Sequence, residues 1–439
     1  MSAIAPAGVG VGEVWDAPAA DAPLDATVEV PGSKSLTNRF LVLAALADAP
    51  VKLSGGLRSS DSDHMIGALR ALGIDVDDTG EVWTVTPSSV RGGAKVNCGL
   101  AGTVMRFVPP MVLLADPADG PVTFDAAASA KSRPMAPLLD GLRALGATVT
   151  SIGDETFPFT VVPPTSVPVE VEVDASDSSQ FVTGLLLTAP RLPGGLTVRH
   201  VGATLPSLPH IDMTCETLRD AGIQVDQPDD RTWVVHPGPI SLGDIRVEPD
   251  LSNAGPFMAA AAVAGGTVRI PGWPSHTTQP GAYYPHILEQ MGATCTLEGD
   301  VMSVTGPEGN LYGVEADLGP AGEITPTIAA MCALAVTPSR LTGIGHLRGH
   351  ETDRLAAIAT EITRLGGTCV ATDDALEITP NPHGLTGAVM DSYHDHRMAT
   401  FAAIIGLAVP GIQILNVGTT SKTMPGFPQM WRAMVSQTA

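Results

Sequence analysis

A short apolar pattern that ends in glycine recurs along the 439-residue chain at a nearly constant interval. Two of its copies, residues 69–73 and 142–146, both read LRALG. The glycines that end the five copies are 70–76 residues apart: Gly73, Gly146, Gly222, Gly292 and Gly366. Glycine directly after an apolar periodic segment is typical of a helix C-cap. Two short apolar runs follow each copy, so each copy predicts a helix that leads into a pair of strands.

This interval divides the chain into about six units, and each unit is larger than the repeats of most solenoid proteins. A unit of this size has room for two helices and four short strands, so we expect a βαβαββ module. A chain of 439 residues exceeds one ordinary hydrophobic core. The sequence therefore predicts an α/β protein with two pseudo-symmetric domains of three modules each.

The charge balance is strongly acidic, with 46 Asp and Glu residues against 24 Lys and Arg residues. This sign argues against nucleic-acid and anionic-membrane partners. The five cysteines contain no Cys-x-x-Cys pair, and no apolar run reaches the ~18 residues of a membrane span. We therefore expect a cytoplasmic protein with reduced thiols. The first ~25 residues are rich in Ala and Pro and lack the basic start of a signal peptide, so they predict a loose arm.

The segment PGSKSLTNR, residues 31–39, is the most informative candidate for anion binding. It contains Lys34, one of five lysines in the chain, and it precedes the apolar residues 40–46. We expect Lys34, Ser35 and Arg39 to lie at the start of a helix, where backbone N–H groups and the helix dipole favour an anion. Taken alone, the segment fits a capped helix with solvated basic residues equally well.

Other polar segments also precede apolar helices. They are residues 99–106 (GLAGTVMR), 130–134 (AKSRP), 174–180 (DASDSSQ), 205–210 (LPSLPH), 347–354 (LRGHETDR), 394–398 (HDHRM) and 421–425 (SKTMP). Helix capping or a solvated charged loop explains any one of them. Their joint occurrence predicts a cleft lined by Lys and Arg, and Arg suits bidentate binding of phosphate and carboxylate.

The order of these motifs resembles the 5-enolpyruvylshikimate-3-phosphate synthases of the enolpyruvyl transferase family. GSKSLTNR, LAGTVMR, SSQ, ETDR, DHRM and SKTMPGF occur in that order, and the resemblance extends from about residue 25 to the end of the chain. It implies two domains of three βαβαββ units, each an inside-out α/β barrel-like structure, that close over a central cleft. The crossovers are expected near residues 31–32 and 247–250. One domain would then comprise residues 1–32 and 249–439, and the inserted domain residues 33–248.

The resemblance implies that the enolpyruvyl group of phosphoenolpyruvate is transferred to the 5-hydroxyl of shikimate 3-phosphate, with release of phosphate and without a metal or other cofactor. The inserted domain is expected to provide mainly shikimate-3-phosphate contacts, and the discontinuous domain mainly phosphoenolpyruvate contacts. The implied contacts to shikimate 3-phosphate are Lys34, Ser35, Arg39, Ser178, Ser179, Gln180, Ser207, Glu323 and His350. The implied contacts to phosphoenolpyruvate are Lys34, Gly102, Arg133, Gln180, Arg354, Arg397 and Lys422.

Three residues are implied to be catalytic. Glu351 matches the family glutamate that protonates the methylene carbon, and Glu323 stands where the family usually has an aspartate base facing the 5-hydroxyl. Two carboxylates in different environments suit such a cycle. Lys34 is implied to contact both substrates. Glu323 is one methylene longer than the usual aspartate.

Other positions also depart from the family pattern. His350 replaces a frequent lysine, and a charge that changes near neutral pH predicts substrate binding that falls as pH rises. Leu100 and Phe107 stand where Asn and Pro are frequent, which leaves sensitivity to glyphosate open. The small Gly102 favours sensitivity, so we expect glyphosate to be an inhibitor and the protein to be a monomer.

Four other functions fit parts of the sequence. The sister enzyme that acts on UDP-N-acetylglucosamine carries a cysteine shortly before an Arg-Pro pair, whereas AAASAKS precedes Arg133 here. A P-loop nucleotide binder would need a Gly-Lys pair that GSKS lacks. A non-catalytic anion-binding protein would not need two carboxylates in a cationic site. A metal-dependent hydrolase could take its ligands from a set of histidines and carboxylates, although neighbouring arginines disfavour a cation. That set is His346, His350, His394, His396, Asp391 and Glu351.

Overall fold

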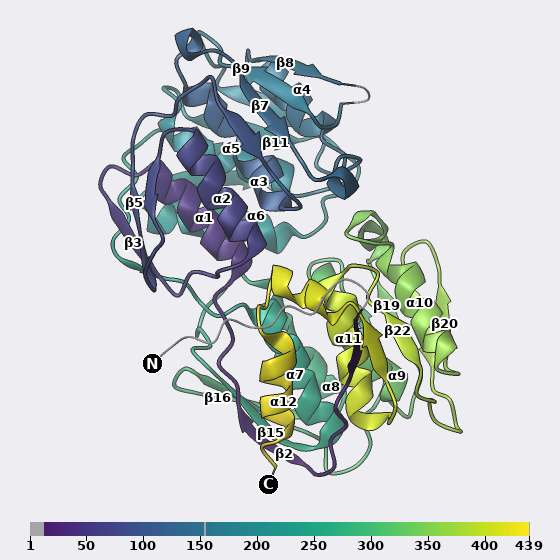
Figure 1. Ribbon diagram of the computed structural model, residues 1–439. Helices are drawn as coiled ribbons and strands as arrows, with labels where there is room; N and C mark the ends of the chain where they lie inside the picture. The colour runs from purple at the N-terminus through teal and green to yellow at the C-terminus, as the bar shows by residue number, and fades with distance from the viewer. Residues whose placement is uncertain (1–12, 153–154, 439) are drawn as a thin grey trace. The chain divides into compact units, whose positions relative to one another are not determined.

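The computed structural model describes residues 13–152 and 155–438, and the chain divides into two compact units (Figure 1). The inserted unit is Gly32–Glu248, drawn from purple to teal. The split unit is Met1–Pro31 together with Pro249–Ala439, and most of it is drawn in green to yellow. The chain therefore begins in the split unit, leaves it after Pro31 and returns to it at Pro249.

The helices of the inserted unit are α1 (Lys34–Ala45), α2 (Ser60–Ala71), α3 (Gly102–Phe107), α4 (Ala136–Ala144), α5 (Gln180–Thr188) and α6 (Leu208–Asp220). Its strands are β3 (Val51–Ser54), β4 (Asp75–Asp77), β5 (Val82–Thr86), β6 (Lys95–Asn97), β7 (Val122–Asp125), β8 (Thr148–Ser151), β9 (Phe159–Val162), β10 (Glu170–Val173), β11 (Leu196–His200), β12 (Val225–Asp229), β13 (Thr232–Val235) and β14 (Ile245–Arg246).

The helices of the split unit are α7 (Leu251–Ala264), α8 (Tyr284–Gln290), α9 (Thr325–Leu334), α10 (Arg354–Arg364), α11 (His396–Ala408) and α12 (Phe427–Val435), with the short 3₁₀ helices η6 (Gly322–Ile324), η7 (Gly345–Gly349) and η8 (Val417–Lys422). Its strands are β1 (Val14–Asp16), β2 (Leu24–Thr27), β15 (Gly266–Pro271), β16 (Thr294–Glu298), β17 (Val301–Thr305), β18 (Glu315–Asp317), β19 (Ser339–Thr342), β20 (Thr368–Ala371), β21 (Leu376–Thr379), β22 (Val389–Asp391) and β23 (Gln413–Leu415).

Small sheets of one recurring pattern build both units. The described residues form six sheets, five of four strands and one of three. In the sheet β6-β7-β9-β8, the first pair is parallel and the other two pairs are antiparallel. Helix α3 connects β6 to β7, and α4 connects β7 to β8. This is the βαβαββ module that the repeat predicted, and the prediction is confirmed.

The glycines of the repeat end the helices as expected. All five have a positive φ, between 85° and 103°. Residues with a Cβ avoid this left-handed region, so glycine lets the chain turn sharply from the helix into the following strand. In the first copy, Ile74 N then donates a hydrogen bond to Leu69 O, back in the last turn of α2. The periodic glycine therefore marks the point in each module where the helix gives way to the hairpin.

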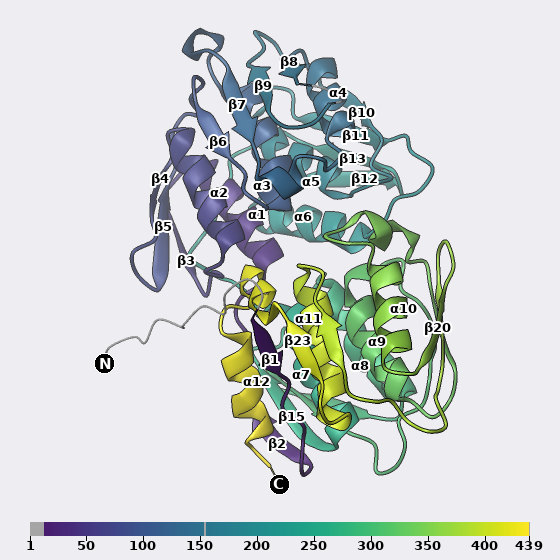
Figure 2. The ribbon, with the colours of Figure 1, turned by 45° about the vertical axis from the view of Figure 1, so that its right-hand side comes forward.

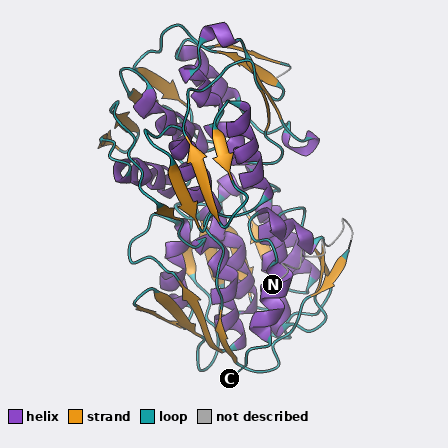
Figure 3. Ribbon diagram, turned by 60° about the vertical axis from the view of Figure 1, so that its left-hand side comes forward, coloured by secondary structure: helices purple, strands orange, loops and turns teal. Residues whose placement is uncertain are grey.

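The first helix of each module lies at the centre of its unit. In the split unit α7, α9 and α11 contact one another, and they lie together in Figures 1 and 2. In the inserted unit α1, α3 and α5 do the same. Helices α7, α9 and α11 are apolar around most of their circumference, as helices buried on all sides are. The strands lie outside them (Figure 3), which is the inside-out arrangement that was expected.

The expectation of a loose N-terminal arm is wrong for residues 13–25. Strand β1 pairs antiparallel with β23 and forms the third strand of the three-stranded sheet. Trp15 in β1 is 5% exposed, and its ring lies 6.3 Å from that of Phe427. Burial of one large aromatic side chain stabilises this pairing against the entropy of a free arm. Residues 1–12 of the expected arm lie outside the described residues.

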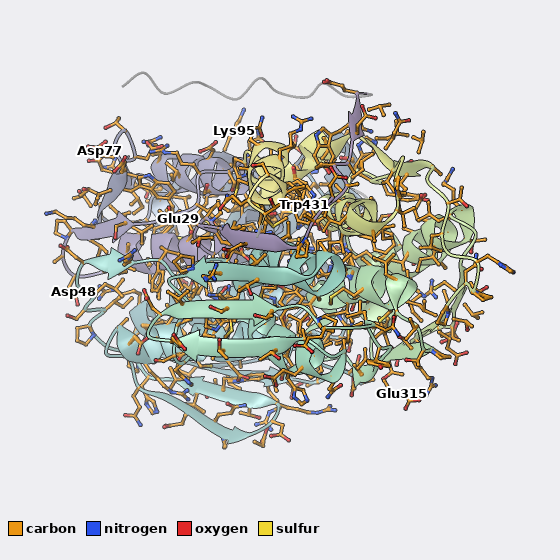
Figure 4. All side chains as sticks on the ribbon, turned by 90° about the horizontal axis from the view of Figure 1, so that it is seen from below. Glu29, Asp48, Asp77, Lys95, Glu315 and Trp431 are labelled. Carbon is orange, nitrogen blue, oxygen red and sulfur yellow. The ribbon has the colours of Figure 1, made fainter. Side chains whose placement is uncertain are left out.

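The interior and the surface differ as expected for a globular chain. Trp431 of α12 is fully buried, whereas the labelled side chains of Asp48, Asp77 and Glu315 lie at the edge of the view in Figure 4. Each unit has its own apolar core. Among the described residues, no helix combines the length and the apolar character that crossing a membrane requires.

Candidate functional site

Arg354 is the centre of a buried ion-pair cluster in the split unit. It is the first residue of α10, and the side chain of Asp353 caps this helix by accepting a hydrogen bond from Ala356 N at 3.0 Å. Arg354 Nε donates to Asp395 Oδ2 at 2.7 Å, and Nη2 donates to Glu351 Oε2 at 2.9 Å. Arg354 is 2% exposed and Asp395 0% exposed. Burial alone would lower the pKa of Arg354, but the carboxylates of Asp395 and Glu351 raise it above its usual value.

Glu351 lies between two cations of this cluster. Arg354 contacts Oε2, and Lys422 Nζ at the end of η8 donates a hydrogen bond to Oε1. Burial raises the pKa of Glu351, but the charges of Lys422 and Arg354 outweigh burial and hold that pKa well below its usual range. Glu351 is therefore a carboxylate at neutral pH in the protein without substrate. Anions that draw the two cations away from it would raise its pKa and make it a better proton donor.

Glu323 is the second acidic group and lies in η6, just before α9. Ser252 Oγ in the first turn of α7 donates a hydrogen bond to Glu323 Oε1, and Arg397 Nη2 lies 3.3 Å from the same oxygen. Arg397 is held in turn because Asp395 caps α11 by accepting a hydrogen bond from Arg397 N at 2.8 Å. Arg397 and the Ser252 hydroxyl thus lie beside Glu323, whereas Arg354 and Lys422 lie beside Glu351. Such a difference in environment separates the roles of two carboxylates.

His350 follows η7 and lies beside Arg354. Its Nδ1 is 3.4 Å from Arg354 Nη1. The packed atoms around the ring and the charge of Arg354 lower the pKa of His350 below its usual value near 6.5. Without substrate, the ring is therefore uncharged at neutral pH. Any pH dependence of substrate binding that comes from His350 is therefore expected below neutral pH, and not near neutral pH as the sequence predicted.

Lys34 begins α1 in the inserted unit, as expected. Ser33 caps the helix, since its Oγ accepts a hydrogen bond from Leu36 N at 3.3 Å. Lys34 Nζ lies 3.6 Å from Asp61 Oδ2 in the first turn of α2, and Asp61 is almost completely buried. Asp61 does not stand out in the sequence, because an acidic residue in the first turn of a helix usually serves the helix dipole.

Arg39 is buried and directed at α6. Its Nε donates to Thr214 Oγ1 at 2.9 Å, its Nη2 to His210 O at 2.7 Å and its Nη1 to Ser35 O at 3.0 Å. The side chain is 1% exposed, and its guanidinium also lies over the ring of Phe107. In this conformation Arg39 ties α1 to α6, and its contact with a substrate phosphate stays a prediction.

Three residues assigned to phosphoenolpyruvate lie together in the inserted unit. A β-carbon placed on Gly102 would lie 3.3 Å from Arg106 Nη1, 3.4 Å from Gln180 Oε1 and 3.9 Å from Arg133 Nη1. Arg133 Nη1 also donates to Leu100 O at 2.8 Å, which fixes it against the glycine turn. Gly102, Gln180 and Arg133 therefore share one small space, which a larger residue at position 102 would narrow.

The three serines assigned to shikimate 3-phosphate lie before two helices of the same unit. Ser178 and Ser179 precede α5, and Ser178 Oγ accepts a hydrogen bond from Gln180 N at 3.3 Å. Ser207 precedes α6 in the left-handed conformation, with φ of 54°. Helices α5 and α6 are in contact, and Thr214 donates to Thr183 Oγ1 at 3.3 Å.

The histidines considered as metal ligands do not form a metal site. The rings of His346 and His350 lie 5.8 Å apart between centroids, and Arg354 contacts His350. Burial lowers the pKa of His346 as well. No group of three or more His, Cys, Asp or Glu side chains within residues 13–152 and 155–438 is arranged to hold a metal ion.

Solved structures share this architecture. An EPSP synthase from Acinetobacter baumannii has a TM-score of 0.78 with 23% identity, covering 95% of this chain and 97% of its own. A second EPSP synthase structure from the same organism has a TM-score of 0.77, with coverage of 94% and 96%. At this identity the likeness establishes the fold: a two-unit α/β protein made of βαβαββ modules.

The sequence comparisons are more specific. The family described as EPSP synthase (3-phosphoshikimate 1-carboxyvinyltransferase) matches residues 18–431. The 3-phosphoshikimate 1-carboxyvinyltransferase of Kocuria rhizophila is 51% identical and covers 96% of this chain and 97% of its own. That of Bifidobacterium longum is 52% identical, with coverage of 97% and 98%. The chain belongs to the EPSP synthase family.

Proposed function

We propose that this protein transfers the enolpyruvyl group of phosphoenolpyruvate to the 5-hydroxyl of shikimate 3-phosphate and releases phosphate. The observation that carries the proposal is the pair of carboxylates, Glu323 and Glu351, held among Arg354, Arg397 and Lys422. Both substrates are anions that such cations bind, and the reaction needs groups that give and take protons. The names of the relatives support this choice of acceptor.

The two carboxylates divide the proton transfers. Glu351 gives a proton to the methylene carbon of phosphoenolpyruvate, while Glu323 takes the proton of the 5-hydroxyl as its oxygen bonds to the adjacent carbon. The anionic groups of phosphoenolpyruvate engage Arg354 and Lys422, which now hold Glu351 as a carboxylate, so substrate binding itself raises the pKa of Glu351. In the elimination, Glu351 takes a proton from the new methyl group and Glu323 returns one to the departing phosphate.

The proposal assigns the remaining residues by substrate. We place Gly102, Arg133, Gln180, Arg354, Arg397 and Lys422 on phosphoenolpyruvate. We place Ser35, Arg39, Ser178, Ser179, Gln180, Ser207, Glu323 and His350 on shikimate 3-phosphate, with Lys34 on both. The converging cations stabilise the anionic intermediate electrostatically, and this is often the largest catalytic term.

We also propose an inhibitor, an oligomeric state and a cellular location for the protein. Glyphosate, an anion directed at the phosphoenolpyruvate site, is expected to inhibit because Gly102 leaves room beside Arg133 and Gln180. The five cysteines are all unpaired, which suits a reducing compartment, and we place the protein in the cytoplasm as a monomer.

Phosphate release from phosphoenolpyruvate by the purified protein tests the proposal. The acceptor is either shikimate 3-phosphate or UDP-N-acetylglucosamine, and EDTA is present throughout. Release only with shikimate 3-phosphate is expected. Release only with UDP-N-acetylglucosamine would make the protein the sister enzyme, and release with neither acceptor would contradict both assignments.

A further inference from the structure

The loop that leads into α11 is held in a conformation that its residues do not favour. Tyr393 and His394 both have a positive φ, 52° and 55°, and neither is a glycine. Each such residue costs about 1 kcal/mol or more, so a consecutive pair persists only where the surroundings hold it. The next residue is Asp395, which pairs with Arg354 and caps α11 at Arg397.

Two hydrogen bonds within the loop shape this turn. Asp391 Oδ1 accepts a hydrogen bond from Tyr393 N at 2.8 Å, and Asp395 N donates to Ser392 O at 2.8 Å. They fix the course of the backbone through the turn. Outside the loop, the pairing of β22 with β23 and the hydrogen bond from Ser392 Oγ to Asn416 O at 3.4 Å hold one side of the turn. Side chains that reach out of the loop hold it against α10.

One such side chain is Tyr393 itself. Its hydroxyl donates a hydrogen bond to Glu361 Oε1 at 2.7 Å, on the neighbouring helix α10. Glu361 is 0% exposed, and its other oxygen accepts a hydrogen bond from Arg364 Nε at 3.0 Å. A buried carboxylate is costly to desolvate, so the buried pair of Glu361 and Arg364 does not by itself indicate that Glu361 stabilises the fold.

The spacing along α10 connects this pair with the ion-pair cluster. Arg354 and Glu361 are seven residues apart, so they lie on one face of the helix, about 10 Å apart along its axis. Arg354 holds Asp395, and Glu361 holds Tyr393. Helix α10 therefore contacts residues 391–395 at two points, Tyr393 and Asp395, and these contacts hold the strained turn.

We propose that Glu361 and Tyr393 are positioning residues, which fix the turn so that Asp395 directs Arg354 and Arg397 toward phosphoenolpyruvate. This inference rests on the proposed function, because it takes these two arginines as phosphoenolpyruvate contacts. Loss of the Tyr393 hydroxyl removes one of these two contacts with α10, while the aromatic ring remains. The turn can then relax, and the arginines lose their alignment without losing their charge.

Steady-state kinetics of Tyr393→Phe test the inference. The KM for phosphoenolpyruvate is expected to rise about tenfold, with the KM for shikimate 3-phosphate within about twofold of wild type. Glu361→Gln is expected to stay within about threefold of wild type on both substrates, because its amide oxygen still accepts the tyrosine hydrogen bond. Tyr312→Phe is the matched control, since Tyr312 is in the same unit and 49% exposed.

The outcomes separate this inference from the proposed function. The inference is overturned if Tyr393→Phe leaves both KM values within twofold of wild type, or raises both equally, whatever its melting temperature. If the wild-type protein is inactive with shikimate 3-phosphate, the proposed function is wrong. Calorimetric binding of phosphoenolpyruvate to wild type and Tyr393→Phe then decides the inference, which requires about tenfold weaker binding by the variant.

Discussion

Replacement of Asp395 by Asn tests how much a buried ion pair contributes to stability, compared with an exposed ion pair at the start of another helix. Asp395 is fully buried, and both of its oxygens accept hydrogen bonds from Arg354. Removal of one partner of a buried pair costs about 3–5 kcal/mol of unfolding free energy. Asparagine can still cap α11, and Arg354 keeps Glu351 as a second partner. We therefore expect Asp395→Asn to lower the unfolding free energy by about 3 kcal/mol, at the low end of that range.

Asp353→Asn is the matched control. Asp353 also caps a helix and also pairs with an arginine, Arg348, at 2.8 Å, but it is 40% exposed. An exposed pair contributes about 0–1 kcal/mol, so the control is expected to lose no more than that. The contrast between the two variants measures burial, because cap, partner type and substitution are the same in both.

Urea unfolding of the split unit provides the measurement. Trp83→Phe and Trp233→Phe together leave Trp15, Trp273 and Trp431 as fluorescent reporters, all in the split unit. A lower midpoint at constant slope reports stability. The reasoning is refuted if Asp395→Asn loses less than about 1 kcal/mol, or no more than Asp353→Asn.

Three further predictions concern individual residues of the candidate site. Lys422→Met removes a charge that lowers the pKa of Glu351, so this pKa rises. The ionised Glu351 contributes stability that is lost as pH falls through its pKa, and in the variant this loss is expected at a higher pH. Acid titration of unfolding measures the shift. Gly102→Ala places a methyl group 3.4 Å from Gln180 Oε1 and is expected to weaken glyphosate inhibition more than phosphoenolpyruvate binding; an unchanged inhibition constant would contradict this. Lys34→Ala should reduce kcat on the order of 10²–10³-fold, and turnover within tenfold of wild type would refute its role at both substrates.

Local chemistry explains why much of the fold was predictable. A glycine with positive φ after a helix is read from neighbouring residues, so the five modules that carry the pattern could be placed along the chain. Strand β1 was missed because its partner β23 lies at the other end of the sequence. Nothing near Trp15 in the sequence indicates that its ring packs beside Phe427.

The candidate site was predictable to a similar degree. Its arginines, lysines and glutamates stand out as rare charges at helix starts, and the structure brings Glu351, Arg354 and Lys422 into one cluster. The residues that hold them were harder to find. Asp61 and Ser252 lie in first turns, where polar residues usually serve the helix itself. The partner of Asp61 is on the other helix of its module, and the partner of Ser252 comes from a different module.

The split unit depends on both ends of the chain, and this orders events during synthesis. Strands β1 and β2 leave the ribosome before the inserted unit, yet the partner of β2 is β15, about 240 residues later, and the partner of β1 is β23, about 400 residues later. The inserted unit, by contrast, has all its strands once β14 has emerged. Because domains generally fold as units during synthesis, the inserted unit is ready while the N-terminal strands are still single and open to wrong partners. The acidic and proline residues at the end of β1 and between the two strands, Asp16, Pro18, Asp21 and Pro23, are of the kinds that discourage such pairing.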